Sequence, residues 1–154
     1  MKILVDADAF PGALHKVLFR AVERVKIQLI LVANRFVTHP ESQYISSITV
    51  AAGPDVADDR IVELACKGDL VITADIPLAD RVITKEAHAL NPRGNLYTED
   101  NIKQQLAVRN LMDEMRSAGM VTGGPAAFNP QDVKAFANNL DRLLTKYHRA
   151  SPCT

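Results

Sequence analysis

This sequence of 154 residues has few aromatic residues and no excess of charge of either sign. Aromatic side chains make up 5% of the chain, and tryptophan is absent. Lysine and arginine number 18, as do aspartate and glutamate, so the formal net charge is zero. Without a global basic field or many stacking rings, the composition disfavours tight duplex binding and a broad base-stacking platform. A local basic patch is compatible with it.

Cysteine and long apolar runs are also scarce. The two cysteines are Cys66 and Cys153, and we expect both to be free thiols, as in a reducing cytosol. No apolar run approaches the roughly 18 residues that a membrane-spanning helix needs. The N-terminus has one lysine and then a strand-like run, without the pattern of a signal peptide. The sequence therefore predicts a cytoplasmic protein with no membrane segment.

The remaining composition is that of one globular domain, with 47% hydrophobic and 23% charged residues. Apolar runs at 2–5, 27–33, 45–50 and 70–72 predict buried strands, and periodic apolar positions predict the helices between and after them. We expect an α/β fold, a three-layer sandwich with a central, mainly parallel sheet. The last two helices, at about 98–118 and from about 130, are expected to cover one face or edge. We assign residues 1–148 to a single domain and expect 149–154 to be a disordered tail.

Carboxylates follow two of the apolar runs. Asp6 and Asp8 come directly after the first run, and Asp75 follows the run at 70–72. Asp75 can also cap the next helix, with Pro77 in the first turn. If the two strands are parallel neighbours, the three carboxylates meet at one edge of the sheet, where open α/β sheets bind ligands. Crowded carboxylates repel one another, and a hard oxygen cluster of this kind suits Mg²⁺ or Mn²⁺.

Other polar residues near predicted strand and helix ends have ordinary structural explanations as well as functional ones. Asn34 follows the second strand and suits a turn. Asp58 and Asp59 lie in the first turn of a helix, where negative charge favours the helix dipole. Asp80 lies on the following helix, where an exposed acid is common. Arg93 lies in a Pro-Arg-Gly turn, where its side chain can be solvated.

Several of these motifs together resemble the YaiI/YqxD family, bacterial proteins that are placed among PIN-like nuclease domains. In PIN-like domains an acid at a helix start precedes a strand that ends Thr-x-Asp, and residues 57–61 with 68–75 are similar to that closing motif. The run that ends in Asp6 and Asp8 is similar to the opening acid of the same domains. The resemblance extends to about Arg142, and its matching segments are 5–9, 32–34, 55–58, 68–79, 89–94, 122–125 and 136–138.

One position departs from the family pattern. Phe10 stands where the family usually has a cysteine before the proline of the first loop. This difference argues against thiol chemistry at that loop and leaves the carboxylates untouched.

The resemblance implies a PIN-like fold and metal-dependent hydrolysis of phosphodiesters, with RNA as the expected substrate. In this hypothesis Mg²⁺ or Mn²⁺ activates a water molecule and offsets charge at phosphorus. The direct metal ligands are expected to be Asp6 and Asp75. The other acids expected to complete the metal site or to orient water are Asp8, Asp58 or Asp59, and Asp80. The polar residues expected to contact phosphate or to support the acids are Asn34, Thr73 and Arg93.

Two other functions stay open. One is a catalytically weak module that binds nucleic acid or a nucleotide and keeps the acidic fold. The other is a receiver-like or phosphatase-like domain, in which an acid after the first strand serves phosphoryl transfer. That chemistry usually needs a lysine after a later strand, whereas Lys85 is predicted inside a helix and Lys67 precedes a strand, so we rank it last. The sequence leaves open the substrate, the number of metal ions, the oligomeric state and the role of the Gly123-Gly124 loop.

Overall fold

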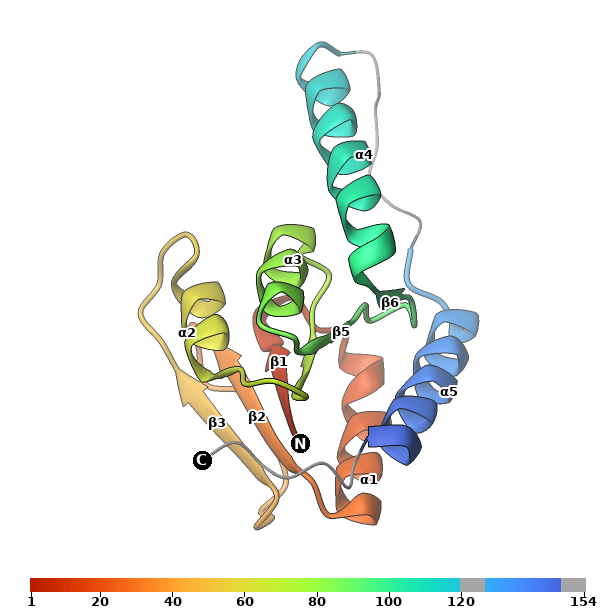
Figure 1. Ribbon diagram of the computed structural model, residues 1–154. Coiled ribbons are helices and arrows are strands. Elements are labelled where there is room, and N and C mark those ends of the chain that lie inside the picture. The colour runs from red at the N-terminus through yellow and green to blue at the C-terminus, as the bar shows by residue number, and fades with distance from the viewer. Residues whose placement is uncertain (120–126, 148–154) are drawn as a thin grey trace.

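The centre of the molecule is a six-stranded sheet with the order β3-β2-β1-β4-β5-β6 (Figure 1). The computed structural model describes residues 1–119 and 127–147. Five neighbouring strands run parallel, and β6 pairs antiparallel with β5. The strands are β1 (Lys2–Asp6), β2 (Gln28–Ala33), β3 (Ile45–Thr49), β4 (Leu70–Ile72), β5 (His88–Leu90) and β6 (Leu96–Tyr97). The predicted α/β class with a mainly parallel sheet is therefore confirmed.

Helices cover both faces of the sheet. Two short 3-10 turns, Ala7–Ala9 and Gly12–Leu14, follow β1. Helices α1 and α5 pack on one face, and α2 and α3 pack on the other, so the structure agrees with a three-layer sandwich (Figure 1). The α-helices in the described ranges are α1 (His15–Val25), α2 (Val56–Leu64), α3 (Ile76–Thr84), α4 (Glu99–Ser117) and α5 (Pro130–Tyr147).

The central strands are apolar along their whole length because both of their faces are buried. In β1, Ile3 and Val5 face the core under α1 and α5, whereas Leu4 faces the core under α2 and α3. In the neighbouring β4, Leu70 lies beside Ile3 in the parallel register and belongs to the same core. Continuous apolar runs rather than alternating ones are the expected pattern for such strands.

Helix α4 differs from the expectation that both C-terminal helices cover the sheet. Helix α5 buries four apolar side chains beside α1. The 19 residues of α4 are all described, and Ile102 is its one buried residue. Val108 and Leu111 are more than half exposed, and the helix projects away from the sheet (Figure 1). Only the first turns of α4 are therefore part of the packed body.

Strands β5 and β6 are not among the strands that the sequence predicted, and residues 91–94 between them were expected to form a turn or loop. They contain three and two residues, too few to show a strand periodicity. They are strands because β4 offers a free edge, on which Leu70 pairs with His88 and Ile72 pairs with Leu90.

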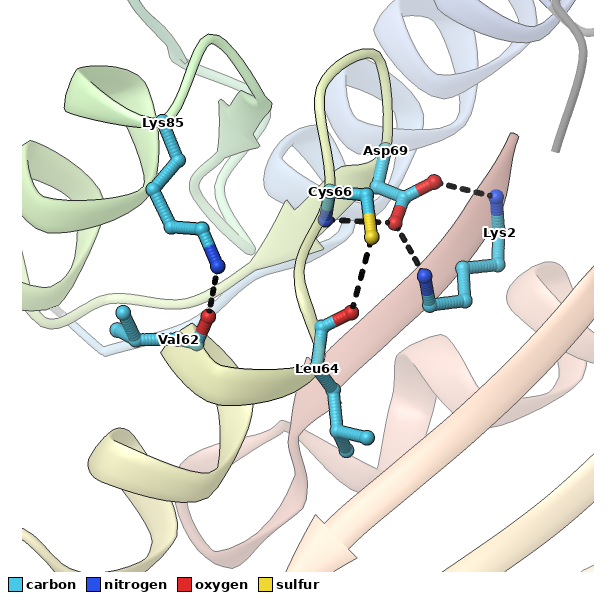
Figure 2. A network of polar contacts seen from close by, with 6 residues as sticks. All are labelled: Lys2, Val62, Leu64, Cys66, Asp69 and Lys85. Atoms are coloured by element: carbon cyan, nitrogen blue, oxygen red, sulfur yellow. Dashed lines mark hydrogen bonds and ion pairs between the residues drawn. The ribbon is translucent and has the colours of Figure 1, made fainter. Parts of the chain in front are cut away.

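The end of α2 is set by polar groups from the segments around it. The N–H of Cys66 donates to Oδ2 of Asp69 at 2.9 Å, and the carbonyl of Val62 accepts from Nζ of Lys85 at 2.6 Å (Figure 2). If α2 continued by one more residue, the N–H of Cys66 would donate to the carbonyl of Val62. Both groups are instead bonded to side chains from outside the helix, so the helix ends here. The buried carboxylate of Asp69 also accepts from the N–H of Lys2 at 3.1 Å and from its Nζ at 2.5 Å. Asp69 thus ties the start of β1 to the loop before β4.

The prediction of a free thiol is wrong for Cys66, which takes part in a disulfide bond. Its Sγ lies 3.8 Å from the carbonyl oxygen of Leu64 (Figure 2). Because Cys66 is not a free thiol, the cysteines no longer indicate a reducing compartment. Cys153, the Gly123-Gly124 loop and the predicted tail at 149–154 lie outside the described residues. Within the described ranges, no helix is long and apolar enough to cross a membrane.

Candidate functional site

Strands β1 and β4 lie side by side at a topological switch point. From β1 the chain crosses one face of the sheet through α1 to reach β2, and from β4 it crosses the other face through α3 to reach β5. Open α/β sheets bind ligands outside the carboxyl ends of the strands at such a point. Asp6 is the last residue of β1, and Thr73 directly follows β4. The two strand ends singled out in the sequence are therefore neighbours.

The hydroxyl of Thr73 joins these two strand ends. Its Oγ1 donates to Oδ2 of Asp6 at 3.2 Å and accepts from the N–H of Asp75 at 3.0 Å. Asp75 in turn caps α3, because its Oδ1 accepts from the N–H of Leu78 at 2.9 Å. Asp75 therefore caps α3 and also lies just beyond the end of β4, as the sequence predicted. Thr73, only 1% exposed, is held between the carboxylate of Asp6 and the backbone N–H of Asp75.

Asp58, in the first turn of α2, is near enough to Asp6 and Asp75 to be affected by their charges. The pKa of Asp58 is raised from 3.8 to about 6, mainly by burial. The charges of Asp75, Asp6 and Asp55 add to this rise, and the charge of Arg81 opposes it. Burial is also the main cause that raises the pKa of Asp6; the hydrogen bond from Thr73 opposes it, and the charges of Asp75 and Asp8 add to it. The acidic site, as we call Asp6, Asp58 and Asp75, thus combines partial burial with mutual repulsion. Within the described residues, none of the three forms an ion pair.

Asp8 faces the loop after β2. Its Oδ2 accepts from the N–H of Asn34 at 2.9 Å, and its Oδ1 lies 3.9 Å from Nε of Arg35. Asn34 therefore contributes a backbone N–H to this edge. Asp8 is close enough to Asp6 to raise its pKa, so it borders the acidic site.

The structure does not bring the remaining predicted residues into the acidic site. Asp59 pairs with Arg81 at 2.9 Å, and Asp80 pairs with Lys103 of α4 at 3.1 Å. Arg93 pairs with Asp132 of α5 at 2.9 Å, and its guanidinium lies 5.9 Å from the ring centroid of Phe128. Arg93 therefore connects the β5–β6 turn to the start of α5.

Two residues near the acidic site had no signal in the sequence. Arg81 acts on Asp58 across the gap between α3 and α2. The buried Tyr97 of β6 accepts a hydrogen bond from Nδ2 of Asn91 at 2.8 Å. Burial raises the pKa of Tyr97, with an added contribution from the charge of Asp75. Neither could be predicted, because Arg81 looks like any exposed helix arginine and β6 is too short to recognise.

The carboxylates of the acidic site supply the right donor atoms for a divalent cation but are not arranged around one point. Among the described residues, no group of three or more His, Cys, Asp or Glu side chains is arranged so that it could hold a metal ion. The donor set itself is appropriate, because carboxylate oxygens are the ligands that Mg²⁺ and Mn²⁺ prefer. Oδ1 of Asp6 and Oδ2 of Asp75 have no hydrogen bond from the described part of the chain. Side-chain rotation would be needed to bring such oxygens onto one ion.

Phe10, where the resemblance led us to expect a cysteine, is a packing residue. It is 8% exposed, its ring stacks on His15 with centroids 5.4 Å apart, and it meets Phe136 edge-on at 6.0 Å. The first loop is therefore held by an apolar contact with α5.

Comparison with known proteins agrees with the resemblance seen in the sequence. The profile described as "Uncharacterized BCR, YaiI/YqxD family" matches residues 4–146. This chain belongs to the YaiI/YqxD family. A UPF0178 protein of Shewanella loihica is 58% identical over 149 residues, which cover 97% of this chain and 99% of the relative. UPF0178 proteins of Hahella chejuensis and Maridesulfovibrio salexigens are 60% and 58% identical over 146 residues, covering 95% of this chain and 97% of each relative.

No solved structure gives a significant match to this YaiI/YqxD chain. The names of the relatives describe no reaction.

Proposed function

We propose that this YaiI/YqxD protein is a metal-dependent phosphodiesterase with a PIN-like fold that acts on RNA at the switch point between β1 and β4. The observation that carries the proposal is the meeting of Asp6, Asp58 and Asp75 from three different elements. Burial first, and then the charges of the neighbouring carboxylates, raise the pKa of Asp6 and of Asp58, which destabilises the ionised folded state. Carboxylates with raised pKa values, placed where a fold of this kind binds ligands, are typical of a functional site.

Asp6, Asp58 and Asp75 would hold Mg²⁺ or Mn²⁺, which relieves the repulsion among them. When bound, such an ion lowers the pKa of a water molecule and offsets negative charge at phosphorus. The chain's own residues supply the positions of the carboxylates. Thr73 fixes Asp6 and the backbone of Asp75 through one hydroxyl, and Asp75 is held further by the cap on α3.

Flanking groups would orient the substrate and water. Asp8 links the acidic site to the loop after β2 through the N–H of Asn34, and its exposed position suits a role at the rim. Arg81 lies close enough to act on Asp58 and would moderate the negative charge there. Asp59, Asp80 and Arg93 are engaged in ion pairs with other partners, so we assign them supporting roles in folding within this proposal.

A cleavage assay tests the proposal directly. Labelled single-stranded RNA is incubated with the purified protein in Mn²⁺ or Mg²⁺, and the products are resolved by length. We expect metal-dependent cleavage, reduced roughly 10- to 100-fold in Asp6→Asn and in Asp75→Asn. Asparagine keeps the helix cap at position 75, because it caps helices as well as aspartate does. Asp141→Asn, on the exposed face of α5, is the matched control and should cleave like the unmodified chain.

A binding module without catalysis is the second candidate, and one observation favours it. As placed, the described carboxylates do not form a group of three that could hold a metal. If RNA is bound but never cleaved, and Asp6→Asn binds it equally well, this second function replaces the first. The phosphatase-like hypothesis stays last, because Lys67 pairs with Glu86 and Nζ of Lys85 donates to the Val62 carbonyl (Figure 2). Neither lysine contacts the acidic site.

A further inference from the structure

Phe36 places an exposed aromatic ring at the loop after β2. All five phenylalanines and three tyrosines of the chain lie in the described ranges. Phe36 is 70% exposed, whereas the other seven are buried or half-buried. A single exposed apolar side chain is common on protein surfaces and needs no explanation by itself. The position of this ring and the residues beside it are what indicate a binding role.

The loop that carries Phe36 is anchored in the core. Val37, the next residue, is 8% exposed and packs with the core under α1. On the outside, the ring of His39 lies 6.2 Å from the ring of Phe36, tilted by 38°, and Nδ1 of His39 lies 2.9 Å from the Pro40 carbonyl. The exposed ring is therefore presented by an anchored loop and has a second ring beside it.

This loop is bonded directly to the rim of the acidic site. The N–H of Asn34 donates to Asp8 at 2.9 Å, and Nε of Arg35 lies 3.9 Å from the same carboxylate. The side chain of Arg35 is 71% exposed, so its guanidinium is open to a ligand. Two residues of extended chain span at most about 7 Å, which keeps the backbone of Phe36 within that distance of Asn34. An aromatic ring, a cation and the carboxylates thus lie along one edge of the sheet.

We infer that Arg35 and Phe36 bind an unpaired nucleotide beside the acidic site, so that single-stranded nucleic acid is the substrate class. The inference rests on the proposed function, because the acidic site defines where the phosphodiester would lie. The ring of Phe36 stacks on the face of one base, and Arg35 contacts the adjoining phosphate. In a duplex both faces of each internal base are covered by its neighbours, so a surface ring has nothing to stack on. The scarcity of aromatics in the chain fits a single stacking position rather than a platform.

Phe36→Trp provides the first readout, because the chain has no tryptophan of its own. The substitution is made together with Asp75→Asn, which slows cleavage and removes one negative charge from the acidic site, and the titration is run without divalent metal. The variant is titrated with a single-stranded RNA hexamer, the matching duplex, and inorganic phosphate. We expect saturable quenching of the tryptophan fluorescence by the single strand, and little change with the duplex or with phosphate.

Affinity measurements on the Asp75→Asn background separate stacking from simple apolar contact. Phe36→Ala should weaken binding of the single strand by roughly 5- to 150-fold, as expected for one lost stacking contact. Phe36→Leu keeps apolar volume without an aromatic face and should weaken binding almost as much, whereas Phe36→Tyr should bind like phenylalanine. Arg35→Gln should lower affinity and reduce the slope of log affinity against log salt by about one. Arg20→Gln, on the exposed face of α1, is the control and should change neither.

The outcomes separate this inference from the proposed function. Metal-dependent cleavage that is lost in Asp75→Asn but unaffected by Phe36→Ala would overturn the inference and leave the proposed function intact. Quenching by the duplex as strong as by the single strand would overturn the substrate class. If no oligonucleotide quenches the fluorescence, Arg35 and Phe36 do not form a nucleotide-binding site, and the inference is overturned. Stacking without cleavage by the unmodified chain would support the nucleotide site and count against hydrolysis.

Discussion

At the scale of single residues, Thr73 and Asp75 show how local structure and a reactive site share the same side chains. Asp75 caps α3 and also contributes its charge to Asp6 and Asp58. An ordinary cap explains the hydrogen bond to Leu78, but it does not explain why the charge of Asp75 acts on Asp58 of another helix. Only the convergence of the three carboxylates distinguishes a site from a helix start.

Asp58 makes the stability of the protein depend on pH in a predictable direction. Its pKa is about 6 when folded and 3.8 for an ordinary side chain, so the folded state holds a proton that the unfolded state releases. The contribution of Asp58 to stability is therefore fully present below pH 3.8 and is lost as the pH rises to about 6. Asp58→Asn removes this loss. Because Asp58 is half-exposed and screened by solvent, we expect a gain of about 1 kcal/mol in the free energy of unfolding at pH 7.

Urea unfolding of both chains from pH 3.5 to 7.5 without divalent metal checks this. The difference between Asp58→Asn and the unmodified chain should grow between pH 3.8 and about 6 and stay constant above. A difference that is the same at every pH would mean that Asp58 is not perturbed in the folded protein. Glu114→Gln, an exposed acid of α4 without an ion pair in the described part of the chain, controls for the removal of one negative charge.

At the scale of elements, the β5–β6 turn connects the edge of the sheet to α5. Arg93 pairs with Asp132, and Nδ2 of Asn139 donates to the carbonyl of Gly94. The backbone of α5 approaches Gly94 so closely that a Cβ there would lie 2.6 Å from the carbonyl carbon of Ala135. Gly94 also has a φ of 97°, which other residues adopt at a cost.

Gly94→Ala should therefore destabilise the protein by about 2–4 kcal/mol, because both the backbone conformation and the packing of α5 resist a side chain. Thermal and urea unfolding measure the change. The matched control is Gly12→Ala, where an added Cβ meets nothing within 4 Å, and we expect a change below about 1 kcal/mol there. If Gly94→Ala is as stable as Gly12→Ala, α5 does not pack against this turn as described.

At the scale of the whole molecule, the parallel sheet could be predicted because its central strands are continuous apolar runs. Asp6, Asp8 and Asp75 could be predicted as a group for the same reason, since each follows one of these runs. The strand order could not, because no local pattern states that β1 lies between β2 and β4. Strands β5 and β6 are stabilised by the edge of β4 rather than by their own residues, and Tyr97 was missed with them. The ion pairs of Asp59 and Asp80 depend on Arg81 and Lys103 from other elements, so sequence alone could not separate them from the acidic site.

Titration of the chain with Mn²⁺ by calorimetry tests the central claim most directly, namely that Asp6, Asp58 and Asp75 form a site for a divalent cation. We predict saturable binding at pH 7 that weakens as the pH falls below about 6, because protons compete for Asp58. Asp75→Asn should weaken binding by at least roughly tenfold, and Asp141→Asn should leave it unchanged. Equal heats for the unmodified chain and Asp75→Asn, or no binding at millimolar metal, would contradict the claim. The acidic cluster would then be a feature of the fold that does not bind metal.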